Sequence, residues 1–111
     1  FEADDVPAAL RAVAGWDITL EEYLAIGERT WLLKRALNNL MGVTAKDDRL
    51  PPPVLVPLPD GGAAGSVPDV ERLRADYYRA RGLDETGRPT RAVLERAGLA
   101  AVADVLWRDG R

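Results

Sequence analysis

Residues 19–42 read TLEEYLAIGERTWLLKRALNNLMG, and this stretch predicts one long helix around which the rest of the chain is organised. Thr19 and Glu22 have the spacing of a capping box, in which both side chains bind backbone N–H groups of the first turn. Gly42 suits the end of the helix, because glycine adopts left-handed backbone conformations without steric cost. At 1.5 Å per residue the helix would span about 35 Å, enough to cross a small domain.

The helical repeat divides this stretch into two faces. An inward face is predicted for the residues that recur at three- and four-residue spacing, namely Leu20, Tyr23, Leu24, Gly27, Thr30, Trp31, Leu37 and Met41. The polar residues that fall opposite are expected to face solvent: Glu21, Glu28, Arg35 and Asn39. The Trp31 side of the helix is therefore the predicted core.

Four shorter helices are expected beside the long one. The first ends at Gly15 and should form a tight hairpin with the long helix. The third runs from a cap at Ser66 or Asp69 to about Arg81, with an inner face of Val70, Leu73 and Tyr77 and with Tyr78 as a further candidate. Thr90 begins the fourth helix, and residues 99–107 suggest a fifth. No stretch alternates as a strand would, so we predict an all-α fold: a small bundle of about five helices, with residues 1–111 forming a single helical domain.

A proline-rich arm follows the long helix. Residues 51–59 contain five prolines, which fix φ and remove backbone donors, so this arm should run extended and cannot be an internal strand. Its apolar side chains are expected to pin it onto the helices: Val54, Leu55, Val56 and Leu58. Residues 60–65 are glycine-rich, but they lack the preceding strand and the following Lys-Ser/Thr of a phosphate-binding loop. We interpret them as a turn.

Composition narrows the classes of function. The 111 residues include 15 Lys and Arg against 18 Asp and Glu, and this net charge of −3 does not suit a nucleic-acid partner. No apolar run approaches the roughly 20 residues of a membrane span, so a cytoplasmic protein is expected. The absence of Cys and His excludes disulfides, thiolate clusters, imidazole catalysis and ordinary zinc sites within the chain. Because the sequence begins with Phe1, we expect a piece of a longer protein.

Lys34 and Asn38 are the candidate binding residues, since both fall within the predicted inward face of the long helix. A buried charge is costly unless it is paired. In one interpretation Lys34 lifts its ammonium to solvent while Asn38 bonds a carbonyl of the proline arm. In the other, both meet an anionic ligand, such as a cofactor, or another domain. We identify no catalytic and no metal-binding residue, because the acidic pairs at 4–5 and 47–48 are more typical of solvated or capping groups and Tyr77-Tyr78 of packing.

Several stretches in unbroken order resemble the C-terminal domain of the tungsten-containing aldehyde ferredoxin oxidoreductases. They are residues 15–17, 26–31, 38, 46–51, 57–61, 77–78, 81–90 and 94–99. The resemblance implies a parent enzyme that oxidises aldehydes to carboxylic acids with tungsten, or molybdenum, held by two pterins. A 4Fe–4S cluster would lie nearby, and electrons would pass to ferredoxin.

The family's pterin motifs and its cluster cysteines do not occur in this chain. The resemblance therefore implies a structural segment that encloses the pocket, contacts the remaining domains and is inactive alone. Leu40 and Pro53 stand where family members often have basic residues, which weakens the case for a cofactor contact here. The alternative is a free-standing helical module for protein interactions.

Overall fold

A computed structural model describes residues 2–108 of the chain, so Phe1 lies outside the described residues. Its elements in order are α1 (Asp5–Ala14), α2 (Leu20–Leu40), the short 3₁₀ helix η1 (Pro52–Leu55), α3 (Val70–Arg81), α4 (Arg91–Arg96) and α5 (Ala100–Leu106). Between residues 2 and 108 the β-type pairing consists of two isolated bridges, at Leu58–Ala64 and Leu83–Pro89. The all-α class and the long central helix are confirmed.

The helix limits follow from local capping. Thr19 Oγ1 accepts from the Glu22 backbone N–H at 3.1 Å, and Glu22 Oε2 accepts from the Thr19 N–H at 2.8 Å, so the predicted capping box is present. Asp69 caps α3 by accepting from the Arg72 backbone N–H, and Thr90 caps α4 by accepting from the Val93 N–H. Gly82 ends α3 with a φ of 67°, a conformation that favours glycine. These limits were predicted because each signal lies within one turn of the helix end.

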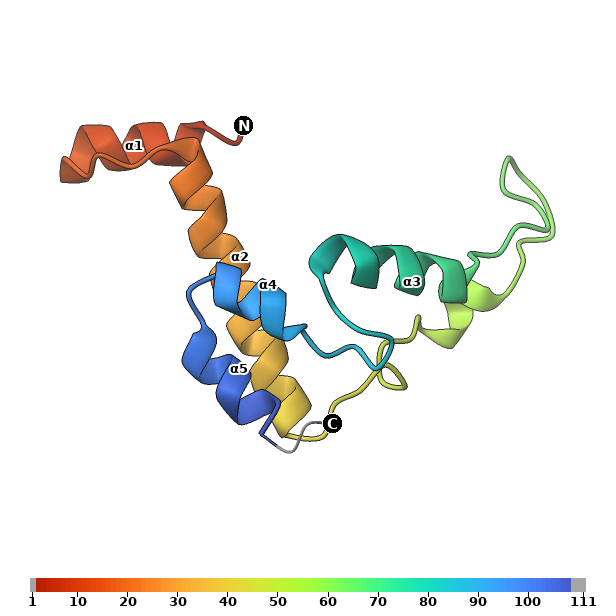
Figure 1. The fold of residues 1–111 in the computed structure, drawn as a ribbon. Coiled ribbons are helices and arrows are strands. Elements are labelled where there is room, and N and C mark those ends of the chain that lie inside the picture. The colour runs from red at the N-terminus through yellow and green to blue at the C-terminus, as the bar shows by residue number, and fades with distance from the viewer. Residues whose placement is uncertain (1, 109–111) are drawn as a thin grey trace.

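A small apolar core joins α4 and α5 to one side of α2 (Figure 1). Its buried residues are Leu32, Ala36, Leu94, Ala103 and Leu106. Trp107 closes the end of this core and donates from its indole nitrogen to the Pro89 carbonyl at 3.0 Å. We call this group the α2–α4–α5 core.

The predicted faces of α2 were largely wrong. Leu32 and Ala36 are buried, and Arg35 and Asn39, which the sequence predicts to face solvent, are half-buried. Most of the predicted stripe is exposed instead, including Leu24, Gly27, Thr30, Leu37 and Met41. Trp31 remains half-buried at the edge of the core. The helix has apolar residues on more than one side, so its periodicity does not define a single buried face.

Three other packing predictions were wrong in whole or in part. Helix α1 packs on the segment that follows it, where Arg11 Nη1 donates to the backbone carbonyl of the buried Ile18 at 2.7 Å. Helix α2 runs away from α1, so the two helices do not form a tight hairpin (Figure 1). The proline arm is not pinned to the helices, because its apolar residues are all exposed: Val54, Leu55, Val56 and Leu58. On α3, Tyr78 is buried whereas Leu73 and Tyr77 are exposed.

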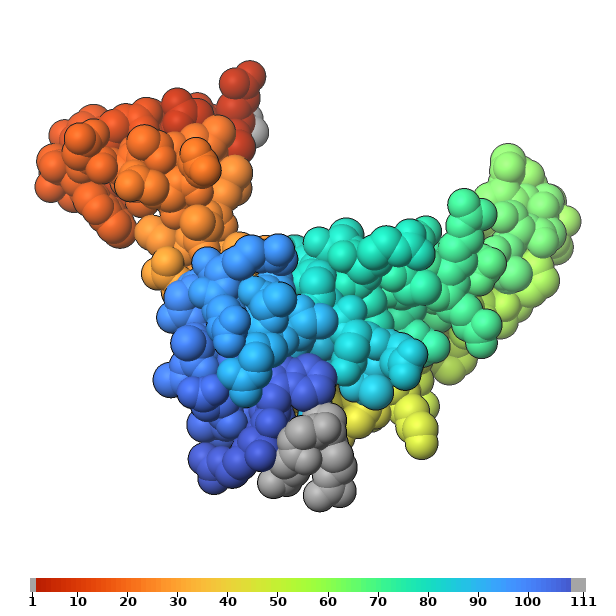
Figure 2. Space-filling view, in the orientation of Figure 1, coloured from red at the N-terminus to blue at the C-terminus, as the bar shows by residue number. Residues whose placement is uncertain are grey.

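The described chain is open in shape. Its radius of gyration is 18.4 Å and its extents are 54 × 44 × 20 Å, whereas a compact chain of about 100 residues has a radius near 13 Å. Helix α1 and the loop between η1 and α3 project from opposite ends of the molecule (Figure 2). None of the helices within residues 2–108 is both long and apolar enough to cross a membrane.

Candidate functional site

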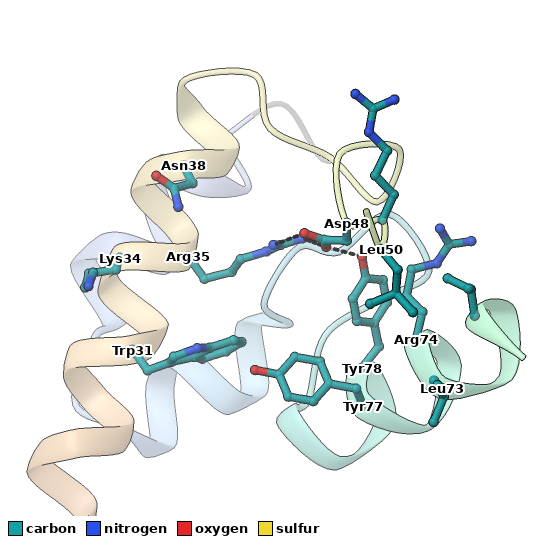
Figure 3. Close-up of a pocket in the computed structure, with 12 residues that line it drawn as sticks. Trp31, Lys34, Arg35, Asn38, Asp48, Leu50, Leu73, Arg74, Tyr77 and Tyr78 are labelled. Atoms are coloured by element: carbon teal, nitrogen blue, oxygen red, sulfur yellow. Dashed lines mark hydrogen bonds and ion pairs between the residues drawn. The ribbon is translucent and has the colours of Figure 1, made fainter. Parts of the chain in front are cut away.

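A cleft of about 510 Å³ lies between α2, the loop at residues 48–50 and α3 (Figure 3). Helix α2 contributes Trp31, Lys34, Arg35 and Asn38, the loop contributes Asp48, Arg49 and Leu50, and α3 contributes Val70, Leu73, Arg74, Tyr77 and Tyr78. The volume lies within the range of about 300–1,000 Å³ that is usual for ligand pockets. This cleft is the candidate site.

One inner wall of the cleft is a hydrogen-bonded group that we call the Arg35 cluster: Arg35, Asp48, Tyr78 and Gly87. The Arg35 guanidinium binds the Asp48 carboxylate through two parallel bonds of 2.9 and 2.5 Å, and its Nε donates to the Gly87 carbonyl at 2.7 Å. The Tyr78 hydroxyl donates to the same carboxylate (Figure 3). Only 12% of the Arg35 side chain is exposed, so these partners offset the cost of removing its charge from water.

The cluster sets the ionisation of its members. The hydrogen bonds from Arg35 lower the pKa of Asp48, against an opposing effect of burial. Burial and the bond to Asp48 raise the pKa of Tyr78 to about 12. The bond to Asp48 also raises the pKa of Arg35. At neutral pH the three groups are therefore carboxylate, phenol and guanidinium, which suits a structural connection rather than proton transfer.

Gly87 is required by the geometry of this cluster. Its φ of 82° favours glycine, and an added Cβ would overlap Arg35 Nη2 and lie 2.8 Å from the Tyr78 hydroxyl oxygen. Asn39 supports the same loop, because its amide donates to the carbonyls of Val43 at 2.9 Å and Gly87 at 3.3 Å. The cluster thus joins α2 to two loops and to α3.

Aromatic and charged side chains form the second wall. The rings of Trp31 and Tyr77 meet edge to face with centroids 6.0 Å apart (Figure 3). The Arg81 guanidinium lies 4.7 Å from the centre of the Trp31 ring and pairs with Glu28. Helix α3 is therefore held to α2 by rings and charges rather than by an apolar core.

Lys34 and Asn38 line the α2 side of the cleft but are exposed rather than buried. Within residues 2–108 neither side chain forms a hydrogen bond or an ion pair, so the expected bond from Asn38 to the proline arm is absent. The neighbouring Asn39 makes the corresponding contact, to the loop after α2. Cofactor binding by Lys34 and Asn38 stays a prediction.

Sequence reasoning missed the Arg35 cluster. The helical repeat predicts that Arg35 faces solvent, and the acidic pair that includes Asp48 is predicted to be solvated or capping. A usable signal existed, since Asp48, Tyr78 and Gly87 all fall in stretches that carry the family resemblance. The other acidic residue of that pair, Asp47, does cap its turn by accepting from the Thr44 N–H at 2.9 Å.

The donor set does not fit a metal ion or an iron–sulfur cluster. The chain has no Cys and no His, and residues 2–108 contain no group of three or more Asp and Glu side chains that could hold a metal. Iron–sulfur clusters require thiolate ligands. An iron–sulfur cluster in a larger enzyme would therefore take its thiolate ligands from residues outside this chain.

Comparison with known proteins agrees with the resemblance. The family model described as aldehyde ferredoxin oxidoreductase, domains 2 and 3, matches residues 1–99. The tungsten-containing aldehyde ferredoxin oxidoreductases of Pyrococcus furiosus and Thermococcus kodakarensis are 40% and 41% identical over 100 residues, which are 88% of this chain and 16% of each relative.

A solved structure is also similar to this chain. It is described as the active site complex BamBC of benzoyl coenzyme A reductase in complex with 1,5-dienoyl-CoA. The TM-score is 0.76 at 25% identity, over 99% of this chain and 16% of that one.

The chain spans about 16% of the length of the curated relatives it matches. Taken with the helical fold, the match over residues 1–99 shows that this chain belongs to the aldehyde ferredoxin oxidoreductase family.

Proposed function

We propose that residues 1–111 act as a single helical unit at the C-terminal end of a tungsten-containing aldehyde ferredoxin oxidoreductase. In this role the chain is structural and helps to enclose the catalytic pocket. The observation that carries the proposal is an apolar groove left open between α2 and α5, in a chain that spans only 16% of its relatives. Such a groove suits contact with the remaining domains of the enzyme.

The groove has a volume of about 240 Å³ and an almost entirely apolar lining: Leu33, Leu37, Leu40, Ala101, Val102 and Val105. Leu33, Leu37, Leu40 and Val105 are each between 43% and 54% exposed. Burial of apolar surface is worth about 25 cal/mol per Å², and contiguous exposed apolar patches mark interaction sites. Leu37 is the residue of the predicted inward face that lines this groove, and we assign the groove to contact with the rest of the enzyme.

The chemistry of the parent would be supplied outside this chain. The names of the two relatives support tungsten, an aldehyde substrate and ferredoxin as electron acceptor. The pterins, the iron–sulfur cluster and a cytoplasmic location follow from the family resemblance. We expect the segment alone to bind no metal and to oxidise no aldehyde, because its donor set includes no thiolate or imidazole.

The test is made on the enzyme that contains the segment. Replacing Leu37 and Leu40 by Asp places charge in the groove and should lower tungsten content and aldehyde-dependent reduction of ferredoxin. Val13→Asp is the matched control, because Val13 is 89% exposed and lies on α1, away from the groove. Unchanged activity in the groove variant would contradict the proposal. A native polypeptide with the intact mass of the 111-residue chain would favour the free-standing module instead.

A further inference from the structure

The cleft between α2 and α3 is positively charged in a chain that is otherwise acidic. Its lining includes four cations, Lys34, Arg35, Arg49 and Arg74, and one carboxylate, Asp48. The chain as a whole has a net charge of −3. A concave surface with an excess of one sign concentrates ligands of the opposite sign. The cleft is therefore suited to an anion.

Three of these cations, Lys34, Arg49 and Arg74, form no ion pair with a carboxylate within residues 2–108. The charge of Arg35 is compensated by Asp48. Arg74 donates to the backbone carbonyl of Ala45 at 3.1 Å and acts on Asp48 only through a longer-range charge interaction, without a direct ion pair. Lys34 and Arg49 are exposed on opposite sides of the cleft, on α2 and on the loop. An incoming anion would thus gain charge-assisted hydrogen bonds without breaking an ion pair.

The lining is also strongly apolar. Trp31 and Tyr77 provide ring surfaces, and Leu50, Val70 and Leu73 provide aliphatic surface. A bare inorganic anion would leave that surface in contact with water, and a neutral apolar molecule would leave the cations without a partner. The ligand that uses both parts has a charged group at one end and an apolar body at the other.

We propose that the cleft binds a small organic carboxylate whose aromatic or branched aliphatic body packs against Trp31 and Tyr77. The guanidinium groups of Arg49 and Arg74 match the planar carboxylate, and Lys34 adds a mobile charge at the rim. The inference rests on the proposed function, in which the enzyme releases carboxylic acids. The cleft would hold the product class of that reaction, with no covalent step.

Benzoate is the probe, with benzamide as its neutral isostere and inorganic phosphate as the simple anion. Binding is followed by the NMR shift of the Trp31 indole N–H in the 111-residue chain, assigned by Trp31→Phe. The titration is repeated on the enzyme that contains the segment, so that the test does not depend on the segment folding alone. We expect a saturable shift with benzoate and binding at least about tenfold weaker for benzamide and phosphate, the change that one charge-assisted contact produces.

The double variant Lys34→Met, Arg49→Ser removes two cations that form no ion pair within residues 2–108. It should weaken benzoate binding at least about tenfold. Lys46→Met is the matched control, because Lys46 is exposed and does not line the cleft. The proposal is overturned if benzoate gives no saturable shift, if benzamide or phosphate binds as tightly, or if Lys46→Met weakens benzoate as much as the double variant. The titration measures binding and not turnover. A failed titration therefore contradicts the benzoate site without contradicting the proposed function, and an enzyme that is inactive on aldehydes contradicts the proposed function without contradicting benzoate binding.

Discussion

The two sides of α2 are held to the rest of the chain by different forces. On one side the α2–α4–α5 core is apolar, and Leu32, Leu94 and Ala103 are fully buried. On the other side α3 is joined through the Arg35 cluster and through the Trp31, Tyr77 and Arg81 contacts. Apolar burial closes the centre of the first interface, whereas directional polar contacts hold α3 at a distance and leave a cleft beside them.

The difference predicts how each interface responds to substitution. Removal of a buried methylene group costs transfer free energy and leaves a cavity, whatever its orientation. Removal of one member of the Arg35 cluster leaves a charged partner without its counter-charge. Damage to the core should therefore lower the stability of the whole segment, and damage to the cluster should act first on the placement of α3.

The largest effect is expected in the α2–α4–α5 core. Leu94 has 0% of its surface exposed, so Leu94→Ala should reduce the free energy of unfolding by about 3–5 kcal/mol. Denaturant unfolding followed by circular dichroism measures it. Leu73→Ala on the exposed face of α3 is the control and should cost far less. Equal losses would show that the two interfaces do not differ in this way.

A glycine pair tests the Arg35 cluster. Gly87→Ala and Gly98→Ala impose a similar backbone strain, because the two φ angles are 82° and 74°, but a Cβ at Gly98 meets nothing within 4 Å. Gly87→Ala should therefore be more destabilising than Gly98→Ala by about 1–3 kcal/mol, since it displaces Arg35 from its partners. The comparison of the two melting curves isolates the clash, and equal stabilities would contradict the role of the cluster.

The free energy of unfolding should depend on pH in both the acid and the alkaline range, for a different residue in each. Folding lowers the pKa of Asp48, so the stability it contributes is present above pH 4 and is lost as the pH falls below about 4, toward the folded pKa. Folding raises the pKa of Tyr78 to about 12, so its contribution is present below about pH 10 and is lost as the pH rises to 12. Asp48→Asn should cost about 1–2 kcal/mol at pH 7 and should remove the acid component.

Measurement of the free energy of unfolding across the pH range checks both the loss of stability in acid and the loss in alkali. Tyr78→Phe should remove the alkaline component and the tyrosinate absorbance that appears near pH 12. An acid profile that is unchanged in Asp48→Asn would show that this carboxylate does not hold α3.

The smallest effect is expected on the open apolar groove. Leu37 is 54% exposed, so Leu37→Gln should change the stability of the isolated chain by no more than about 0.5 kcal/mol. In the enzyme that contains the segment, the same change should lower thermal stability clearly, because the groove would be covered there. A large loss in the isolated chain would mean that this face already packs within the segment.

Much of the local structure could be predicted from the sequence. The capping box at Thr19 and Glu22, the cap at Asp69 and the left-handed Gly82 each depend on residues within one turn, so the limits of α2 and α3 follow from neighbouring residues alone. The family could also be identified, because short motifs keep their order along the chain whether or not they meet in space.

Only the tertiary structure decided which side of α2 is buried and what forms the site. Arg35 is charged, and nothing near it in sequence indicates burial, because its partners Asp48 and Gly87 lie 13 and 52 residues away. The sequence pattern predicts that Leu37 is buried, but an apolar pattern does not show whether the residue packs within this chain or against another domain. Periodicity reports how apolar each face is, but only the folded contacts show which partner covers it.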